Sequence, residues 1–117
     1  MAKLSTHVLD TAAGKPATGV RIVLFHVTAT ERRQCGSAVT NKDGRTDEPL
    51  LSGDSIATGV YELVFEAGEY FKRYGIDLPN PPFFDEVVIR FGISDGSGAY
   101  HVPLLLSPYG YTTYRGS

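Results

Sequence analysis

At 117 residues and 12.7 kDa, the chain has the length of one domain, and its 42% hydrophobic and 21% charged residues are typical of a globular protein rather than a disordered one. Its net charge of −2 lacks the basic footprint that nucleic acid or an anionic membrane surface requires, so we expect neither as a partner. Cys35 is the only cysteine, which excludes a secreted scaffold held by intrachain disulfides.

The first segment, Leu4–Asp10, alternates with a period of two residues, which predicts a strand. Its residues fall on two faces, with Leu4, Thr6 and Val8 on one and Ser5, His7 and Leu9 on the other. The N-terminus has no apolar run typical of a signal peptide, and no stretch approaches the roughly 20 apolar residues of a membrane helix. We therefore expect a cytoplasmic protein with no membrane partner.

Two further predicted strands surround a tight turn. Residues 20–28 are rich in β-branched and aromatic side chains on both faces, which is typical of a strand covered on both sides. Residues 34–40 form a shorter strand, and Asn41-Lys42-Asp43-Gly44 is a turn sequence with a glycine available for positive φ. Because Arg45 follows the turn directly, we expect the turn to hold this side chain in place.

The second half of the chain predicts one helix among further strands. Residues 59–66 alternate as a strand, and residues 68–74 are the only plausible helix, with Gly75 where a C-terminal cap belongs. Residues 84–93 and 99–106 form two more strands, and a Ser-Pro corner folds a last strand back.

The whole pattern is seven or eight short strands separated by turns every ~8–12 residues. It predicts an all-β sandwich in a single domain that covers residues 1–117.

The last long strand has two different faces. Its core face holds Tyr100, Val102, Leu104 and Leu106. Its opposite face carries His101, Pro103 and Leu105, where a solvent-facing strand would carry Lys, Glu or Thr. The first strand has His7 and Leu9 on its own non-core face. An apolar outer face on a small sandwich indicates a subunit interface, so we expect both imidazoles to lie on an oligomeric face.

The three histidines are not equivalent. A lone strand histidine is usually structural, and His26, which has apolar neighbours on its own face, belongs to that class. His7 and His101 occur together with Arg45 and the terminal residues 114–117, a combination harder to explain by structure alone. Imidazole exchanges protons near neutral pH, and arginine binds planar oxygen-bearing groups. The combination suits the addition of water to a polar, anionic, planar ligand.

Two other patterns are weaker. Residues 92–96 match G-x-S-x-G, but a nucleophile elbow requires a strand-to-helix turn, whereas here a strand meets a hairpin turn. The three histidines lack the spacing of zinc ligands. We treat both patterns as chance matches.

The chain resembles the 5-hydroxyisourate hydrolases, transthyretin-like enzymes of urate degradation. Three stretches carry the likeness: Leu4-Ser5-Thr6-His7-Val8-Leu9-Asp10, Asp43-Gly44-Arg45-Thr46, and the segment from His101 to Ser117. The likeness extends over the whole chain. Its specific part is Tyr114-Arg115-Gly116-Ser117, because this ending separates the family's enzymes from its hormone-carrying transthyretins.

The resemblance implies a transthyretin-like (prealbumin-like) β-sandwich of two four-stranded sheets with one short helix. It further implies a homotetramer, a dimer of dimers with active sites at the dimer–dimer interface. The implied reaction is hydrolysis of 5-hydroxyisourate to 2-oxo-4-hydroxy-4-carboxy-5-ureidoimidazoline, with no cofactor and no metal.

By match to the family's motifs, His7, Arg45, His101 and Ser117 are catalytic, and His7, Arg45 and Tyr114 bind substrate. We expect the histidine pair to activate water and Arg45 to stabilise the developing oxyanion. Tyr114 would cap the pocket, and Ser117 with its terminal carboxylate would order a histidine or the water. Two imidazoles of similar intrinsic pKa can exchange roles, so the resemblance does not say which is the base.

Two other functions remain open from the sequence. A transthyretin-type carrier would hold a small aromatic ligand in an inter-dimer channel, although His7, His101 and Tyr114 would place proton-transfer groups and a bulky phenol there. A structural or adhesive sandwich module would be a monomer. Fold identity alone does not decide among these functions.

Overall fold

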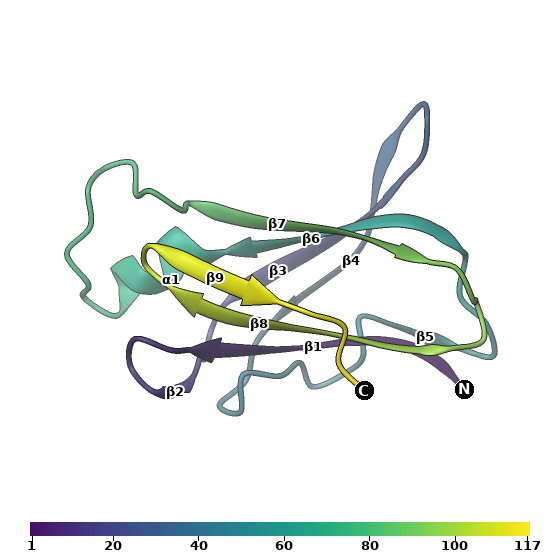
Figure 1. The fold of residues 1–117 in the computed structure, drawn as a ribbon, viewed down its shortest axis with the longest axis horizontal. Helices are drawn as coiled ribbons and strands as arrows, with labels where there is room; N and C mark the ends of the chain where they lie inside the picture. Colours follow the sequence, from purple (N-terminus) through teal and green to yellow (C-terminus); the bar gives the residue numbers. More distant parts are fainter.

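The computed structural model describes residues 1–117, and its strands form two sheets with one helix at one end of the strands (Figure 1). In chain order the elements are β1 (Ala2–Asp10), β2 (Lys15–Pro16), β3 (Arg21–Val27), β4 (Arg32–Val39), β5 (Leu51–Gly53), β6 (Gly59–Glu66), α1 (Ala67–Arg73), β7 (Glu86–Ile93), β8 (Ala99–Ser107) and β9 (Gly110–Thr113). The expected all-β sandwich with one short helix is confirmed. No helix is long and apolar enough to cross a membrane.

The first sheet has the order β2-β1-β8-β9, with β5 also paired to β1. At its centre, β1 and β8 run parallel in an unbroken register from Lys3 beside Ala99 to Asp10 beside Leu106. The sheet contains five strands rather than the expected four. The additional strand arises because neither β2 nor β5 is long enough to pair with the whole edge of β1. They pair with opposite ends of that strand, β2 at Leu9 and Asp10 and β5 at residues 2–4.

The second sheet has the order β4-β3-β6-β7, and every pair in it is antiparallel. Its pairing extends β4 back to Arg32, before the predicted start of that strand, with an irregularity in the β3–β4 register between Leu24 and Phe25. The expectation that β3 is covered on both faces was too strong: Ile22 and Leu24 are buried, whereas Val23 on the other face is only half-buried.

The core lies between the two sheets and follows the predicted alternation. β1 contributes Leu4 and Val8, and β8 contributes four buried residues, which are Tyr100, Val102, Leu104 and Leu106. Leu63 and Phe65 of β6 face them from the second sheet, fully buried. The outer-facing residues of β1 and β8, including His7 and His101, are therefore left on the other side of the first sheet.

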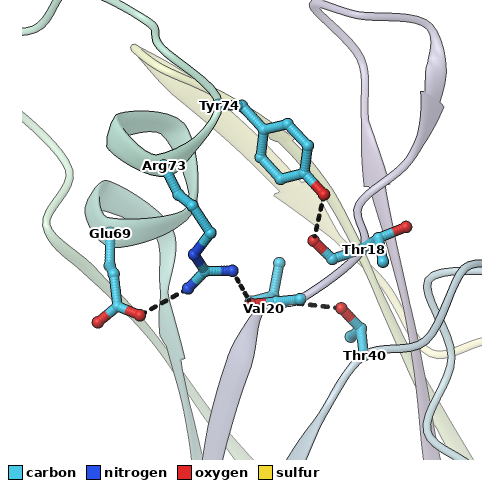
Figure 2. Close-up of polar contacts among 7 residues, drawn as sticks. Thr18, Val20, Thr40, Glu69, Arg73 and Tyr74 are labelled. Carbon is cyan, nitrogen blue, oxygen red and sulfur yellow. Dashed lines mark hydrogen bonds and ion pairs between the residues drawn. The ribbon is translucent and has the colours of Figure 1, made fainter.

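Helix α1 begins within two residues of the predicted position and ends before Gly75, whose positive φ of 78° continues the chain past the cap. Its polar side chains bind the loop that precedes β3 (Figure 2). Arg73 pairs with Glu69 and donates a hydrogen bond to the Gly19 carbonyl at 2.7 Å, and the Tyr74 hydroxyl donates to the Thr18 carbonyl at 3.1 Å.

On the buried side of the helix, the Tyr70 hydroxyl donates a hydrogen bond of 2.8 Å to the Asp10 carboxylate. Asp10 is itself buried at the end of β1 and also accepts main-chain N–H groups from Ala12 and Ala13. Burial, followed by the hydrogen bond to Asp10, raises the pKa of Tyr70 and keeps the phenol a donor. This contact joins the helix to the strand that carries His7.

We predict that Tyr70→Phe lowers the free energy of unfolding by about 1.5–3 kcal/mol, because it leaves a buried carboxylate without one of its donors. Tyr74→Phe, at the residue that follows the helix, is the matched control: Tyr74 is 46% exposed, and removal of its hydroxyl should change stability by less than about 0.5 kcal/mol. Urea titration followed by circular dichroism measures both. Equal losses in the two variants would contradict the role assigned to Asp10.

Candidate active site

The candidate site lies on the outer face of the first sheet, where β1 and β8 are neighbours. The parallel register sets Ser5 beside His101 and His7 beside Pro103. His7 and His101 are both half-buried, as expected of side chains on a sheet face that is partly covered. The strand pairing therefore brings together two imidazoles that are 94 residues apart in the chain.

Arg45 reaches this face through the predicted turn. Gly44 is buried and has a φ of 75°, and its carbonyl accepts the Val8 N–H at 2.7 Å. An isolated antiparallel bridge then pairs Arg45 with His7. The turn is further held by the Asn41 side-chain oxygen, which accepts the N–H of Arg45 at 3.2 Å. Arg45 therefore emerges beside His7 with its main chain fixed and its side chain exposed.

The same turn orients His7. Its Nε2 lies 2.9 Å from the carbonyl oxygen of Asp43. Since a carbonyl oxygen only accepts hydrogen bonds, the neutral ring carries its proton on Nε2 and has its lone pair on Nδ1.

His101 is held from the adjacent strand, where Ser5 Oγ lies 2.9 Å from its Nδ1. Burial lowers the pKa of His101 below its usual value, and the positive charges of Arg45, His7 and Lys3 lower it further. At neutral pH this imidazole is therefore mainly uncharged and able to accept a proton.

The C-terminal tail covers part of His101. Beyond β9, the Gly116 N–H donates to the His101 carbonyl at 2.8 Å. A Cβ at position 116 would lie 2.6 Å from Cδ2 of the His101 ring, so only glycine allows this close approach. The Arg115 guanidinium lies 4.5 Å from the centre of the Tyr100 ring. These contacts tie down the chain end and bring Ser117 to the site.

A cavity of about 450 Å³ lies between these elements. It is lined by Lys3, Ser5, Arg45, Ala99, Tyr100, His101 and Ser117. Two basic side chains, Lys3 and Arg45, thus line one space together with the His101 imidazole. Such a site can bind a planar ligand with oxygen or negative charge and can move a proton at its edge.

Two of the predicted site residues lie outside the lining of this cavity. His7 pairs with Arg45 but does not line the cavity itself, and in its protonated form it lowers the pKa of His101. Tyr114 is 58% exposed and lines a neighbouring cavity of about 280 Å³, which also includes His101. Within one protomer, His101 is therefore the predicted site residue common to both cavities.

Lys3 and Ser5 line the cavity but were not among the predicted site residues. A signal for them existed, because both occupy alternate positions on the β1 face that carries His7. By contrast, the G-x-S-x-G match spans the end of β7 and the turn into β8, so the helix that a nucleophile elbow needs is absent. No group of three or more His, Cys, Asp or Glu side chains is arranged to hold a metal.

The sequence profile of the HIUase/Transthyretin family matches residues 4–116. The chain is 56% identical over 115 residues to "5-hydroxyisourate hydrolase 2" of Rhizobium meliloti (strain 1021), and the match covers 98% of this chain and 96% of that protein.

Two solved structures share the fold. A crystal structure of (S)-allantoin synthase matches with a TM-score of 0.92 and 44% identity over 99% of this chain, which spans only 44% of that longer chain. Transthyretin from Sparus aurata matches with a TM-score of 0.85 and 29% identity, over 97% of this chain and 96% of that one.

The turn geometry generates a prediction about Gly44. In Gly44→Ala the alanine would have to adopt a positive φ, and its Cβ would also overlap the Val8 carbonyl oxygen. Gly14→Ala is the matched control, because Gly14 has a φ of 72° and a Cβ added there would meet nothing within 4 Å.

We expect Gly14→Ala to lower the free energy of unfolding by about 1–2 kcal/mol, the cost of a left-handed residue alone. Gly44→Ala should cost at least about 3 kcal/mol, because the overlap adds to that strain. Denaturant titration measures stability, and amide chemical shifts of residues 43–45 and 7–8 report the position of the turn. Similar losses in the two variants, with unchanged shifts, would contradict the docking described here.

Proposed function

Because the chain belongs to the HIUase/transthyretin family, we propose that it hydrolyses 5-hydroxyisourate to 2-oxo-4-hydroxy-4-carboxy-5-ureidoimidazoline. The observation that carries the proposal is the meeting of Arg45, His101 and Ser117 at one cavity. The identity to a 5-hydroxyisourate hydrolase over nearly the full length of both chains supports the same activity. The protein is accordingly a hydrolase, and the proposed catalytic groups belong to its own residues.

In the proposed reaction, water adds to the carbonyl carbon of a ring amide. The water loses a proton to an imidazole of the His7/His101 pair as its oxygen bonds to carbon. The C–N bond of the ring then breaks, and the leaving nitrogen takes up a proton to become the ureido group. The former carbonyl becomes the carboxyl group that the product name describes, so the hydroxyl of the water ends on carbon and its other hydrogen on nitrogen. Ionisation of this new acid then releases one proton to solvent.

Arg45 supplies the positive charge in this scheme. Its guanidinium is permanently protonated and lines the cavity with His101, so it can stabilise the oxyanion that forms when water attacks. His7 pairs with Arg45, and its Nδ1 lone pair can accept an N–H of the substrate ring. Binding and charge stabilisation therefore come from the same short bridge between β1 and the turn.

The tail completes the proposed site. Tyr114 would cap the ligand from the cavity that shares His101, and Ser117 would order the histidine or the attacking water. Both residues are exposed in the single protomer, as is the Arg45 side chain. A site this open does not exclude bulk water. Its openness therefore favours closure by another subunit.

We accordingly propose a homotetramer, a dimer of dimers, in which the outer face of the first sheet lies at the dimer–dimer interface. Leu9 and Leu105 sit on this face beside the two imidazoles and are only half-buried in the protomer. Apolar side chains on an exposed sheet face are expected at subunit contacts.

A carrier function is the second candidate, favoured by the structural match to Sparus aurata transthyretin. The fold permits it, but a carrier has no use for an uncharged imidazole beside an arginine. Identity is also much lower, at 29% against 56% for the hydrolase relative.

The proposal predicts that the wild-type protein accelerates the ultraviolet decay of freshly generated 5-hydroxyisourate. His101→Gln should lower kcat/KM by about 10²–10⁴-fold, since it removes a proton-transfer group. Arg45→Gln should lower it by about 10²–10³-fold, as expected for loss of one oxyanion-stabilising group. His26→Gln is the matched control, because this ring stacks on Tyr61 of the second sheet, 4.6 Å between centroids, away from the cavity.

Circular dichroism of each variant separates a lost catalytic group from a lost fold. No acceleration by the wild type, together with saturable binding of a small aromatic ligand, would favour the carrier. Wild-type turnover in folded His101→Gln would remove this residue from the reaction.

The assembly generates a separate prediction. Sedimentation equilibrium should give about four times the chain mass of 12.7 kDa for the wild type. Leu105→Glu should yield smaller species with reduced turnover, because it buries a charge in the proposed interface. Val88→Glu, a change of the same kind on the exposed side of β7 in the second sheet, tests whether the effect is specific to this face. A wild-type mass near one chain would contradict the tetramer.

A further inference from the structure

The contact between Ser5 and His101 joins two side chains of the cavity, and the proposed reaction leaves it without a role. Ser5 Oγ lies 2.9 Å from Nδ1 of His101, and the two residues are direct neighbours in the parallel β1–β8 register. Ser5 is half-buried and lines the same cavity as Arg45 and Ser117. Its hydroxyl is therefore built into the site by the sheet itself.

Ser5 is the only side chain that hydrogen-bonds the His101 ring. The Cγ–Cδ2 side of the ring is covered by Gly116, where even one added carbon would overlap it. Nε2 has no partner within the protomer and is the remaining polar atom of the ring. The orientation of His101 therefore depends on Ser5 at one end and on the tail at the other.

Several charged groups face this ring. Lys3 and His7 lie on β1, and Arg45 lies on the turn after β4. Burial is the main cause of the lowered pKa of His101, and the positive charges of these three groups lower it further. The tail adds Tyr114 and Arg115, which line the second cavity with His101 and with Arg90 of β7, and Ser117, which lines the first cavity. Because burial and then these positive charges lower its pKa, the ring is neutral at pH 7 and carries one N–H.

Which nitrogen carries that hydrogen depends on the direction of the bond to Ser5. A serine hydroxyl can accept from Nδ1–H or donate to an Nδ1 lone pair. The surroundings favour the first direction, because Lys3 and Arg45 line the same cavity, can only donate hydrogen bonds, and therefore favour a lone pair on the remaining ring nitrogen, Nε2. A lone pair on Nε2 leaves the hydrogen of the neutral ring on Nδ1, the nitrogen nearest Ser5.

We propose that Ser5 is a positioning residue whose hydroxyl accepts Nδ1–H of His101, so that Nε2 keeps its lone pair and takes the proton from the attacking water. The inference rests on the proposed hydrolysis and deepens it. His7 is held in the opposite tautomer by the Asp43 carbonyl, with its hydrogen on Nε2. Two imidazoles of equal intrinsic pKa are thus made inequivalent by one hydroxyl and one carbonyl.

Ser5→Ala and Ser5→Thr in the full chain test this role. Ser5→Ala should lower kcat by about tenfold with little change in KM, the loss expected from one hydrogen bond that orients a base. Ser5→Thr should restore most of the rate, because it keeps the hydroxyl and suits a strand. Ser37→Ala, an exposed serine on the edge strand β4, is the matched control and should match the wild type.

The pH profile distinguishes the two bond directions. Activity needs neutral His101, so kcat/KM should fall at acid pH. The apparent pKa of this acid limb in the wild type should lie below the ordinary histidine pKa of about 6.5. Removing an acceptor of Nδ1–H disfavours the protonated ring, so Ser5→Ala should move this limb to lower pH. Movement to higher pH would mean that Ser5 donates to Nδ1, which would overturn the proposal.

Nitrogen-15 NMR of the histidine rings gives a readout that does not depend on turnover. Nδ1 of His101 should show the shift of a protonated nitrogen and Nε2 that of an unprotonated one, with the reverse pattern for His7. In Ser5→Ala the nitrogen-15 shifts of Nδ1 and Nε2 of His101 should move toward the average of the two tautomers, while the shifts of His7 and His26 stay unchanged. An unchanged His101 tautomer in Ser5→Ala would contradict the inference.

The two proposals fail in different ways. If the wild type leaves the decay of 5-hydroxyisourate unchanged, the proposed hydrolysis fails, whatever the ring tautomers are. If the wild type is active and Ser5→Ala equals it in kcat, in acid limb and in ring shifts, the hydrolysis stands and the role of Ser5 is wrong.

Discussion

The parallel pairing of β1 with β8 is the constraint on which the rest of the structure depends. It joins the two ends of the chain through an unbroken register from Lys3 beside Ala99 to Asp10 beside Leu106. Side chains alternate between the faces of a strand, so a slip of one residue would exchange the core face and the outer face. The same pairing therefore buries the apolar half of both strands and sets His7 and His101 on the outside.

Two main-chain contacts attach the other site elements to this pair of strands. The Gly44 carbonyl accepts the Val8 N–H, and the Gly116 N–H donates to the His101 carbonyl. A side chain would collide with the Val8 carbonyl oxygen at position 44 and with the His101 ring at position 116, which is why glycine is required at both. Because the main chain does the anchoring, the side chains of Arg45 and Ser117 remain free to line the cavity.

The electrostatics of the cavity separate it from an inert binding channel. Lys3 and Arg45 make the space positive, and burial together with these charges keeps His101 uncharged by lowering its pKa. A neutral imidazole beside fixed cations is the arrangement needed for accepting a proton while negative charge develops nearby. The openness of the site on one protomer links this chemistry to the proposed tetramer, since a second subunit would exclude water and complete the pocket.

The sequence by itself determined the local features: the period-two strands, the helix ended by Gly75, the turn at Gly44 and the faces of β1 and β8. Local periodicity and turn chemistry act over a few residues, so they are readable without the fold. Only the tertiary structure decided which strands are neighbours. The parallel register between distant segments put Ser5 against His101 and Lys3 into the cavity, and assigned Tyr114 to a second cavity. Alternation tells which face a residue occupies, but not which residue lies beside it.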